Sequence, residues 1–475
     1  MALIEGDKET TYGALRERVA RFAGGLAAAG LEPGDRVAIA LPTSSDFVIA
    51  YLGALRGGYV AVPLNPHSPG PELTRELATV RPSILVTTAE AAGTAAERSR
   101  TMLAREVAAI DADLAPLFDR DANDAAVLLF TSGTAGAPKA AVLTHGSLIA
   151  NLEQMEKRAG LASSDDVGIL IIPAFHVFGL NAVLGLSLFV GAAIVLVDRF
   201  DAVGTLALAA RHKVTTLAAV PAVFAAWATM PEVRGDELKT VRLTVSGAAA
   251  LADDVARAFE QRFGIPLLQG YGLTEASPAV SFPDPLKAAR VGSVGTPLRG
   301  VEVRIVDVDG EEVDHGDPGE LLVRGPNIFA GYFEDAGATS HVLDRAGWLH
   351  TGDVAVQAED GTLTLVDRRK DLIIVSGFNV YPAEVEDALR AHPEVAEAAV
   401  VGVPDATTGE AVRAFVVPTP SLWPESAEAP PDEAGDELTR HCARLLARYK
   451  CPTQISFVRD MPRGLVGDPL RRALR

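Results

Sequence analysis

A loop of small hydroxyl and glycine residues follows an apolar run near residue 130. The sequence reads Val127-Leu-Leu-Phe-Thr-Ser-Gly-Thr-Ala-Gly-Ala-Pro-Lys139, so the hydroxyl and glycine residues come directly after the run and Lys139 closes the loop. A buried strand that ends in such a loop can turn several backbone N–H groups toward one phosphate, while the lysine adds positive charge. Pro138 stands where a Walker A loop has the glycine before its lysine, so the pattern differs from that loop. Taken alone, the loop fits a phosphate site and a flexible surface turn equally well.

Two further stretches could hold a purine nucleotide and a metal ion. Gln269-Gly-Tyr-Gly-Leu-Thr-Glu275 combines an aromatic ring for stacking with glycines that allow close backbone approach. Its Thr and Glu side chains can serve a phosphate oxygen and a hard cation. The stretch Ser246-Gly-Ala-Ala-Ala250 has side chains too small to obstruct a planar ring, although it could also be an ordinary helix start. Thr351-Gly-Asp353 offers a carboxylate, or no more than a turn.

Together these motifs resemble the adenylate-forming superfamily of acyl-CoA synthetases, luciferases and peptide-synthetase adenylation domains. Thr131–Lys139, Gln269–Glu275, Thr351–Asp353 and Asp367-Arg-Arg-Lys-Asp371 occur in the order and approximate spacing of that superfamily. The resemblance covers essentially the whole chain. It implies an acyl-CoA synthetase that uses ATP and Mg²⁺ to convert a carboxylic acid to an acyl-adenylate, with CoA as co-substrate and acyl acceptor.

The resemblance also implies roles for individual residues. Tyr271 is expected on adenine, Thr274 on phosphate, Glu275 on Mg²⁺, Asp353 on both ribose hydroxyls, and Arg368 at the ribose and phosphate side. The full set expected to bind ATP or AMP is Thr131, Ser132, Gly133, Thr134, Lys139, Gly247, Ala248, Ala249, Gly270, Tyr271, Gly272, Thr274, Asp353 and Arg368.

The acyl and thiol sites are expected around two other segments. Pro173-Ala-Phe-His-Val-Phe-Gly179 resembles the family's acyl-pocket gate, although a lone histidine in an apolar run is usually a core residue. His176 cannot supply the fixed negative charge that amino-acid-activating members place there, so an amino-acid substrate is disfavoured. The acyl pocket is expected to include His176, Val220, Pro221, Val223, Ala248 and Leu273. Because Ala218–Phe224 and Ala248–Leu251 contain no cation for a second carboxylate, a fatty or other apolar acyl tail is favoured. Val375–Pro382 resembles the loop that lines the pantetheine channel, with Ser376, Gly377 and Phe378 at CoA.

The closing motif departs from the family at one position. The family reads Pro, several residues, Gly, Lys, then Leu-Arg-Arg, whereas this chain reads Pro462-Arg-Gly-Leu-Val-Gly-Asp-Pro-Leu-Arg-Arg472. Asp468 therefore stands in place of the catalytic lysine that bridges the substrate carboxylate and the α-phosphate, and an anion there adds repulsion. Either adenylation is impaired or Arg471 or Arg472 substitutes. Two alternatives stay open: transfer of the acyl group to a carrier protein, and a catalytically impaired homologue that only binds nucleotide or acyl ligands.

The elements that must position these residues point to an α/β fold. Short β-branched runs alternate with Ala- and Leu-rich stretches at helical period, which favours parallel sheets wrapped by helices. The runs are Arg36–Ala40, Ile84–Thr87, Val127–Phe130, Ala192–Val197 and Leu243–Val245. From about residue 290 Gly-punctuated strands, among them Val301–Val306 and Glu320–Arg324, predict a β-rich subdomain over about 290–369. We expect an N-terminal adenylate-forming domain over 1–369, a hinge at Lys370, and a small mobile α+β domain over 371–475.

The net charge and the cysteine content of the chain disfavour several classes of partner and site. The chain has 62 acidic and 43 basic residues, a formal charge of -19, which disfavours nucleic acid and anionic membrane surfaces. Its two cysteines, Cys442 and Cys451, support neither a disulfide framework nor a zinc site, and together with the lack of a signal-like N-terminus they favour a cytoplasmic protein. Ile169–Val197 is apolar for long enough to cross a bilayer, but internal polar residues favour strand, loop, helix and strand. Acyl chain length and oligomeric state are not encoded in these patterns.

Overall fold

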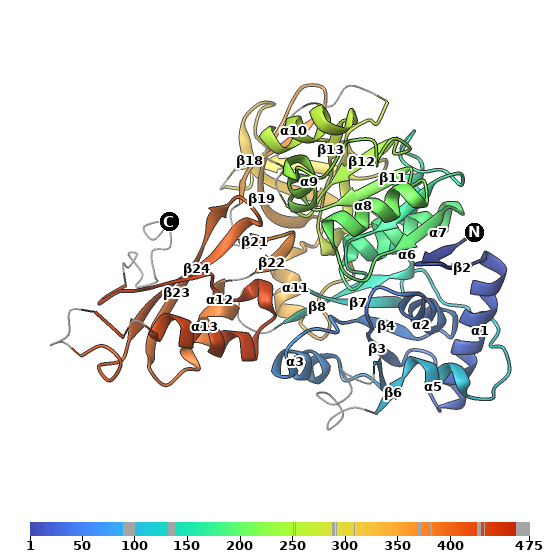
Figure 1. Cartoon of the computed structure of the whole chain (residues 1–475), viewed down its shortest axis with the longest axis horizontal. Helices are drawn as coiled ribbons and strands as arrows, with labels where there is room; N and C mark the ends of the chain where they lie inside the picture. The colour runs from blue at the N-terminus through green and yellow to red at the C-terminus, as the bar shows by residue number, and fades with distance from the viewer. Residues whose placement is uncertain are drawn as a thin grey trace. The chain divides into compact units, whose positions relative to one another are not determined.

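The computed structural model describes residues 1–88, 100–131, 138–249, 251, 253–286, 290, 292–307, 309–368, 373–380, 382–424, 429–431 and 433–461. Contacts group the chain into two compact units, whose elements are labelled in Figure 1. The first unit consists of Met1–Pro66, Val80–Phe130 and Ala140–Arg369, and the second of His67–Thr79, Thr131–Lys139 and Lys370–Arg475.

Two mainly parallel sheets form most of the first unit. One has the strand order β6-β5-β3-β4-β7-β8, and the pairs that join β6 to β7 are parallel. Its strands are β3 (Arg36–Ala40), β4 (Val60–Pro63), β5 (Ile84–Thr87), β6 (Thr101–Leu103), β7 (Ala125–Thr131) and β8 (Lys139–Thr144). The other has the order β13-β12-β11-β9-β10-β1-β2, in which only β1 and β2 pair antiparallel. Its strands are β1 (Leu3–Glu5), β2 (Lys8–Thr10), β9 (Val167–Leu170), β10 (Ala193–Leu196), β11 (Thr216–Ala219), β12 (Leu243–Ser246) and β13 (Leu267–Gln269). The predicted α/β class with parallel sheets is confirmed.

Side-chain caps fix where several helices of this unit begin. Ser44 Oγ accepts from Phe47 N at 3.3 Å at the start of α2, and Thr144 and Ser147 form a reciprocal capping box at the start of α6. Figure 1 shows α8, α9 and α10 beside β11, β12 and β13. The helices are α1 (Tyr12–Ala28), α2 (Ser45–Arg56), α5 (Ala104–Ala109), α6 (His145–Glu156), the π-helix η1 (Phe178–Gly185), α7 (Leu186–Val190), α8 (Ala202–Arg211), α9 (Pro221–Thr229), α10 (Asp253–Phe263), η2 (Thr274–Ala276) and α11 (Ala336–Val342).

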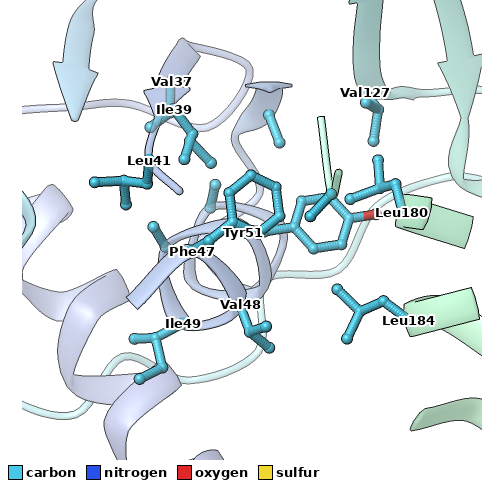
Figure 2. Close-up of a cluster of buried hydrophobic side chains, with 14 of the residues drawn as sticks. Val37, Ile39, Leu41, Phe47, Val48, Ile49, Tyr51, Val127, Leu180 and Leu184 are labelled. Atoms are coloured by element: carbon cyan, nitrogen blue, oxygen red, sulfur yellow. The ribbon is translucent and has the colours of Figure 1, made fainter. Parts of the chain in front are cut away.

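The largest apolar cluster fixes the helix that follows His176. Figure 2 shows Phe47 and Tyr51 of α2 among side chains of β3, with Leu180 and Leu184 of η1 on the other side. The Phe47 and Tyr51 rings stack with centroids 6.3 Å apart. Burial raises the pKa of the Tyr51 phenol, so this side chain stays neutral. Because Leu180 and Leu184 are fully buried in this cluster, η1 is held rigidly against the first sheet.

An antiparallel sheet completes the first unit. Its order is β14-β15-β16-β20-β19-β18-β17. The strands are β14 (Tyr271–Gly272), β15 (Ala279–Phe282), β16 (Ser293–Pro297), β17 (Glu302–Val306), β18 (Pro318–Arg324), β19 (Leu349–Gln357) and β20 (Leu363–Arg368). The sheet therefore begins earlier than residue 290, because the short β14 and β15 pair with β16.

The second unit is built on a sheet of order β22-β21-β24-β23, to which β25 adds beside β24. Its strands are β21 (Ile373–Val375), β22 (Phe378–Val380), β23 (Val395–Asp405), β24 (Gly409–Pro418) and β25 (Gln454–Phe457). Its helices are α3 (Gly70–Val80), α12 (Pro382–Arg390), α13 (Ala434–Leu445) and the 3₁₀-turn η3 (Arg448–Lys450). Helix α3 lies between β4 and β5 in the sequence, yet its contacts place it in this unit.

A buried charge cluster joins α3 to η3 and α12. Lys450 Nζ lies 2.5 Å from Glu72 Oε1 and 3.0 Å from Glu384 Oε1, and all three side chains are less than a tenth exposed. Glu72 Oε2 also accepts from Ala447 N at 2.9 Å. Burial, reinforced by the Glu72 charge, raises the pKa of Glu76 to about 8. One lysine thus balances two carboxylates, and a third is held in its protonated form at neutral pH.

Within the described ranges, no helix combines the length and hydropathy needed to cross a membrane. The apolar stretch Ile169–Val197 is confirmed as strand, loop, helix and strand, formed by β9, η1, α7 and β10.

Candidate active site

Residues expected at the adenine and the ribose meet in the first unit. The Tyr271 hydroxyl donates a hydrogen bond to Asp353 Oδ2 at 2.7 Å. Tyr271 is buried and Asp353 is half-buried. Arg368 is the Cα partner of Asp353 across β19 and β20. A ribose hydroxyl carries the same kind of donor as the tyrosine hydroxyl, so the Asp353 carboxylate has the chemistry to accept it.

Asp353 is held inside a strand and does not belong to a free turn. Thr351 Oγ1 donates to Leu321 O at 2.7 Å and accepts from Asp353 N at 3.1 Å. Gly352 between them has a φ of 70°, and the β18–β19 register shifts at this point. The result is a bulge in β19 that turns the carboxylate out of the regular ladder.

Glu275 is oriented by a tyrosine from elsewhere in the first unit. Its Oε1 accepts from the Tyr332 hydroxyl at 2.6 Å, and its backbone oxygen accepts from Phe329 N at 2.9 Å. Among the described residues, no group of three or more His, Cys, Asp or Glu side chains is arranged to hold a metal ion. A single carboxylate fits Mg²⁺ in a nucleotide site, because this ion usually takes one or two protein carboxylates and completes its shell with phosphate oxygens and water.

Tyr332→Phe is expected to weaken Mg²⁺ binding in the presence of ATP by about 10-fold, since partners that orient a metal ligand typically contribute at least that much. Titration of Mg²⁺ against ATP binding measures this. Tyr12→Phe, which removes a hydroxyl bonded to Ala192 O, is the matched control. An unchanged Mg²⁺ affinity in Tyr332→Phe would remove Glu275 from the metal site.

Buried amide side chains hold the segment that carries Thr274 and Glu275. Asn151 donates to Ala279 O at 2.8 Å and accepts from Ala279 N at 3.0 Å. Asn181 donates to Ser277 O at 2.7 Å, and Asn327 to Ala276 O at 2.9 Å. Sequence analysis missed these positioning residues. Their signal is an amide in an otherwise apolar stretch, since a buried amide needs partners.

The His176 imidazole is neutral. Burial lowers the pKa of His176 to about 4. Its Nδ1 accepts from Phe178 N at 3.3 Å, which assigns the proton of the neutral ring to Nε2. The side chain therefore offers an uncharged N–H donor.

His176 is expected to add no ionisation to the pH–rate profile between pH 5 and 8. With a folded-state pKa near 4, below the ordinary histidine value, its neutral form stabilises the fold above about pH 6.5, and this stability is lost as the pH falls toward 4. The acid limb of thioester formation from a supplied acyl-adenylate should therefore keep its midpoint in His176→Gln. A midpoint near 6.5 that disappears in the variant would contradict a neutral His176.

The stretch after β12 forms a tight turn. A side-chain carbon added to Gly247 would lie 2.9 Å from Cε1 of Phe178, so only glycine fits beneath that ring. Ala248 has a φ of 66°, a left-handed conformation that non-glycine residues seldom adopt and that clusters at functional sites. Ala249 follows it, and α10 begins only at Asp253.

Other residues expected at the nucleotide or at CoA belong to the second unit. Thr131 ends β7 and Lys139 begins β8, and Thr131 Oγ1 donates to Lys139 O at 3.4 Å. Ser376 and Gly377 form the two-residue turn of the β21–β22 hairpin, with φ values of 50° and 84°. Two successive left-handed residues are typical of a type I′ hairpin, and this backbone conformation explains why glycine occupies position 377. The Phe378 ring stacks on Tyr449 with centroids 4.5 Å apart.

Five expected site residues lie outside the described part of the chain. They are Ser132, Gly133, Thr134, Lys370 and Asp468. The hinge at Lys370 and the role of Asp468 at the position of the family's lysine therefore stay predictions.

A cavity of about 60 Å³ lies between η1–α7 and the second parallel sheet. Its apolar lining includes Ala182, Leu186, Leu217, Ala218 and Val245. Of the residues expected at the acyl pocket, Val223 of α9 is buried in the core, Val220 packs against that core, and Pro221 opens α9. The acyl pocket stays a prediction. Sequence analysis included Ala218 in a segment expected at the acyl pocket but missed Ala182, Leu186, Leu217 and Val245.

Family models match both parts of the chain. The model of AMP-binding enzymes matches residues 1–333, and the model of the AMP-binding enzyme C-terminal domain matches residues 384–465. The chain belongs to the AMP-binding enzyme family. The first match covers more than half of this AMP-binding enzyme and contains Tyr271 and Glu275.

Relatives of this AMP-binding enzyme are acyl-CoA ligases. A feruloyl-CoA synthase of Amycolatopsis sp is 38% identical over 100% of this chain and 95% of its own length. A long-chain-fatty-acid–CoA ligase of Yersinia pestis is 35% identical over 100% of this chain and 91% of its own. The solved structure of an amide bond synthetase from Marinactinospora thermotolerans superposes with a TM-score of 0.90 at 31% identity and covers 100% of this chain and 96% of that one. The expected membership of the adenylate-forming superfamily is confirmed.

Proposed function

We propose that this AMP-binding enzyme is a carboxylate:CoA ligase that activates an apolar monocarboxylic acid through an acyl-adenylate. The cavity beside η1 carries the proposal. Among the described residues, Asp166 is the only charged residue that lines it, and both carboxylate oxygens of Asp166 bind Arg242, at 2.9 and 2.5 Å. A cavity without an unpaired charge favours a substrate whose tail is uncharged.

In the first half-reaction a carboxylate oxygen of the acid attacks the α-phosphorus of ATP, and the bond to pyrophosphate breaks. The side chains proposed to act here are Tyr271 beside the adenine, Asp353 on the ribose hydroxyls and Glu275 toward Mg²⁺. When bound, the ion neutralises phosphate charge. The hydrogen bonds that Tyr271 and Tyr332 donate to Asp353 and Glu275 hold both carboxylates in place before the nucleotide arrives, which lowers the cost of ordering them.

In the second half-reaction the CoA sulfur attacks the acyl carbon and AMP leaves. The turn at Ser376 and Gly377 is proposed to line the thiol path, and residue 370 to be the hinge that brings it there. The neutral His176 suits this step, because an uncharged wall beside the thiol path leaves the acyl carbon without a competing cation.

A panel of aliphatic and aromatic acids tests the proposal by CoA consumption and by AMP release. Apolar monocarboxylic acids are expected to react and dicarboxylic acids of the same length to fail. Synthetic acyl-adenylates, offered in parallel with CoA, bypass the first half-reaction. If no acid and no acyl-adenylate gives a thioester, CoA is not the acceptor.

A second candidate is a nucleotide- and acyl-binding homologue with impaired turnover, favoured by Asp468 at the lysine position. Pyrophosphate exchange into ATP separates the two candidates. A homologue that only binds would bind ATP and acyl-adenylate, exchange no pyrophosphate, and form no thioester from a supplied adenylate.

A further inference from the structure

Helix α3 is anchored at its end to one part of the chain, while its side chains contact another part. Arg36 of β3 donates to Val80 O at 2.5 Å and to Arg81 O at 3.0 Å, which fixes the end of α3 beside β3. His67–Thr79, by contrast, is grouped by its contacts with Lys370–Arg475. The proposed hinge begins this C-terminal segment. A swing of the segment about the hinge therefore has to break its contacts with α3.

Three acidic side chains and one lysine meet at this contact. Lys450 Nζ binds Glu72 and Glu384 at 2.5 and 3.0 Å, and Glu76 follows Glu72 by one turn of α3. The groups whose charges act on Glu76 are Glu72 and Arg75 of α3, Glu384 of α12, and Tyr449 and Lys450 of η3. Burial raises the pKa of the Tyr449 phenol, so this side chain stays neutral. Arg75 is exposed, and its guanidinium donates to Leu445 O at 3.4 Å.

The buried contact is short of positive charge. If all three acids were ionised, their carboxylates would share the single buried ammonium group of Lys450. The Oε2 atoms of Glu76 and Glu384 are buried and have no hydrogen-bond partner among the described residues. Because an unpaired buried charge costs far more than a buried neutral acid, a proton on Glu76 stabilises the contact. Burial, and then the Glu72 charge, accordingly raise the pKa of Glu76 to about 8.

We propose that the contact between α3 and the C-terminal segment is a proton-dependent latch, which is closed while Glu76 carries a proton and opens when Glu76 ionises. The inference rests on the proposed ligase function, in which the C-terminal segment has to move between the two half-reactions. Once the latch is open, water reaches the Glu76 carboxyl and its pKa returns from about 8 to the ordinary value of 4.5. The closed form is therefore favoured at low pH. Its equilibrium constant falls by about 10-fold per pH unit between these two pKa values and levels off above the higher one.

Spin labels on the two sides of the contact test the latch in the full-length protein. Ala78→Cys in α3 and Arg440→Cys in α13 place the labels at exposed positions. The native Cys442 and Cys451 are buried, and the chain without the two added cysteines measures any label that they take up. Pulsed electron paramagnetic resonance then gives the distribution of label distances at pH 6 and at pH 9. The ratio of the short, closed distance to longer ones is expected to fall by more than about 10-fold between these pH values.

Glu76→Gln in the labelled chain should keep the latch closed at both pH values, because its amide cannot ionise. Glu153→Gln is the matched control, since Glu153 is an exposed helical residue that pairs with Lys157, and this variant should keep the pH dependence. Thermal unfolding at pH 6 verifies that each variant folds, and Glu76→Met serves if Glu76→Gln does not.

Two results would overturn the inference: an equal closed fraction at pH 6 and pH 9 in the labelled chain with Glu76 intact, or a pH dependence that survives in Glu76→Gln. The distance measurement needs no catalysis. If no acid and no acyl-adenylate gives a thioester, the proposed function fails, while the labels still decide whether the contact depends on this proton.

Discussion

Asp468→Lys is expected to raise the rate of acyl-adenylate formation by about 10²-fold or more, the scale of one electrostatic contact to a charge that develops in the transition state. The family places a lysine at this position between the substrate carboxylate and the α-phosphate, and a carboxylate there would repel both groups. Pyrophosphate release at saturating ATP and acid measures the first half-reaction. Thioester formation from a supplied acyl-adenylate should change little, because that step does not use the position, and it is the internal control.

The competing explanation is that a neighbouring arginine already performs this role. In that case the unmodified protein forms adenylate quickly, Asp468→Lys has little effect, and Arg471→Ala or Arg472→Ala abolishes the step. A fast unmodified protein that neither arginine variant slows would contradict both explanations.

Lys450→Met is expected to destabilise the second unit by about 3–5 kcal/mol, the usual cost of removing one partner from a buried ion pair. Methionine keeps most of the side-chain volume but leaves the carboxylates of Glu72 and Glu384 without their cation. Urea unfolding, followed by a probe on this unit, measures the loss. Lys157→Met is the control, because its exposed pair with Glu153 at 2.9 Å should contribute less than about 1 kcal/mol.

The pH dependence of unfolding tests whether Glu76 is protonated in the fold. Glu76 has a pKa of about 8 in the fold and an ordinary value when unfolded, so its protonation stabilises the fold at low pH, and this contribution is lost as the pH rises toward 8. Glu76→Gln should therefore flatten the stability profile between pH 5 and 8. A profile with the same slope in Glu76→Gln would show that Glu76 is ionised in the fold.

Local patterns predicted the strands well, because each strand carries its own β-branched run. Arg36–Ala40 and Ile84–Thr87 coincide with β3 and β5, and the runs at 127, 243 and 320 fall within β7, β12 and β18. Helix α13 begins at Ala434. Acidic residues in its first turn favour that start.

The motifs drew attention to Tyr271, Glu275 and Asp353, but the hydrogen bonds between these residues and their partners join distant parts of the chain. Nothing in the local pattern links Tyr271 with Asp353, or Glu275 with Tyr332, since such pairs are set by how the antiparallel sheet folds. Most of the cavity lining escaped sequence analysis for the same reason. It comes from η1, α7 and the strands β9, β11 and β12, which only the fold brings together.

The membership of α3 in the second unit limits how this chain can be recombined with its relatives. Glu72 precedes Lys450 by 378 positions, yet the two side chains share one buried hydrogen bond. A graft of residues 370–475 onto another scaffold would bring the lysine without this carboxylate, and the host would have to supply a matching acid. Exchange of the C-terminal segment therefore calls for a discontinuous donor piece, in which residues 67–79 travel with it.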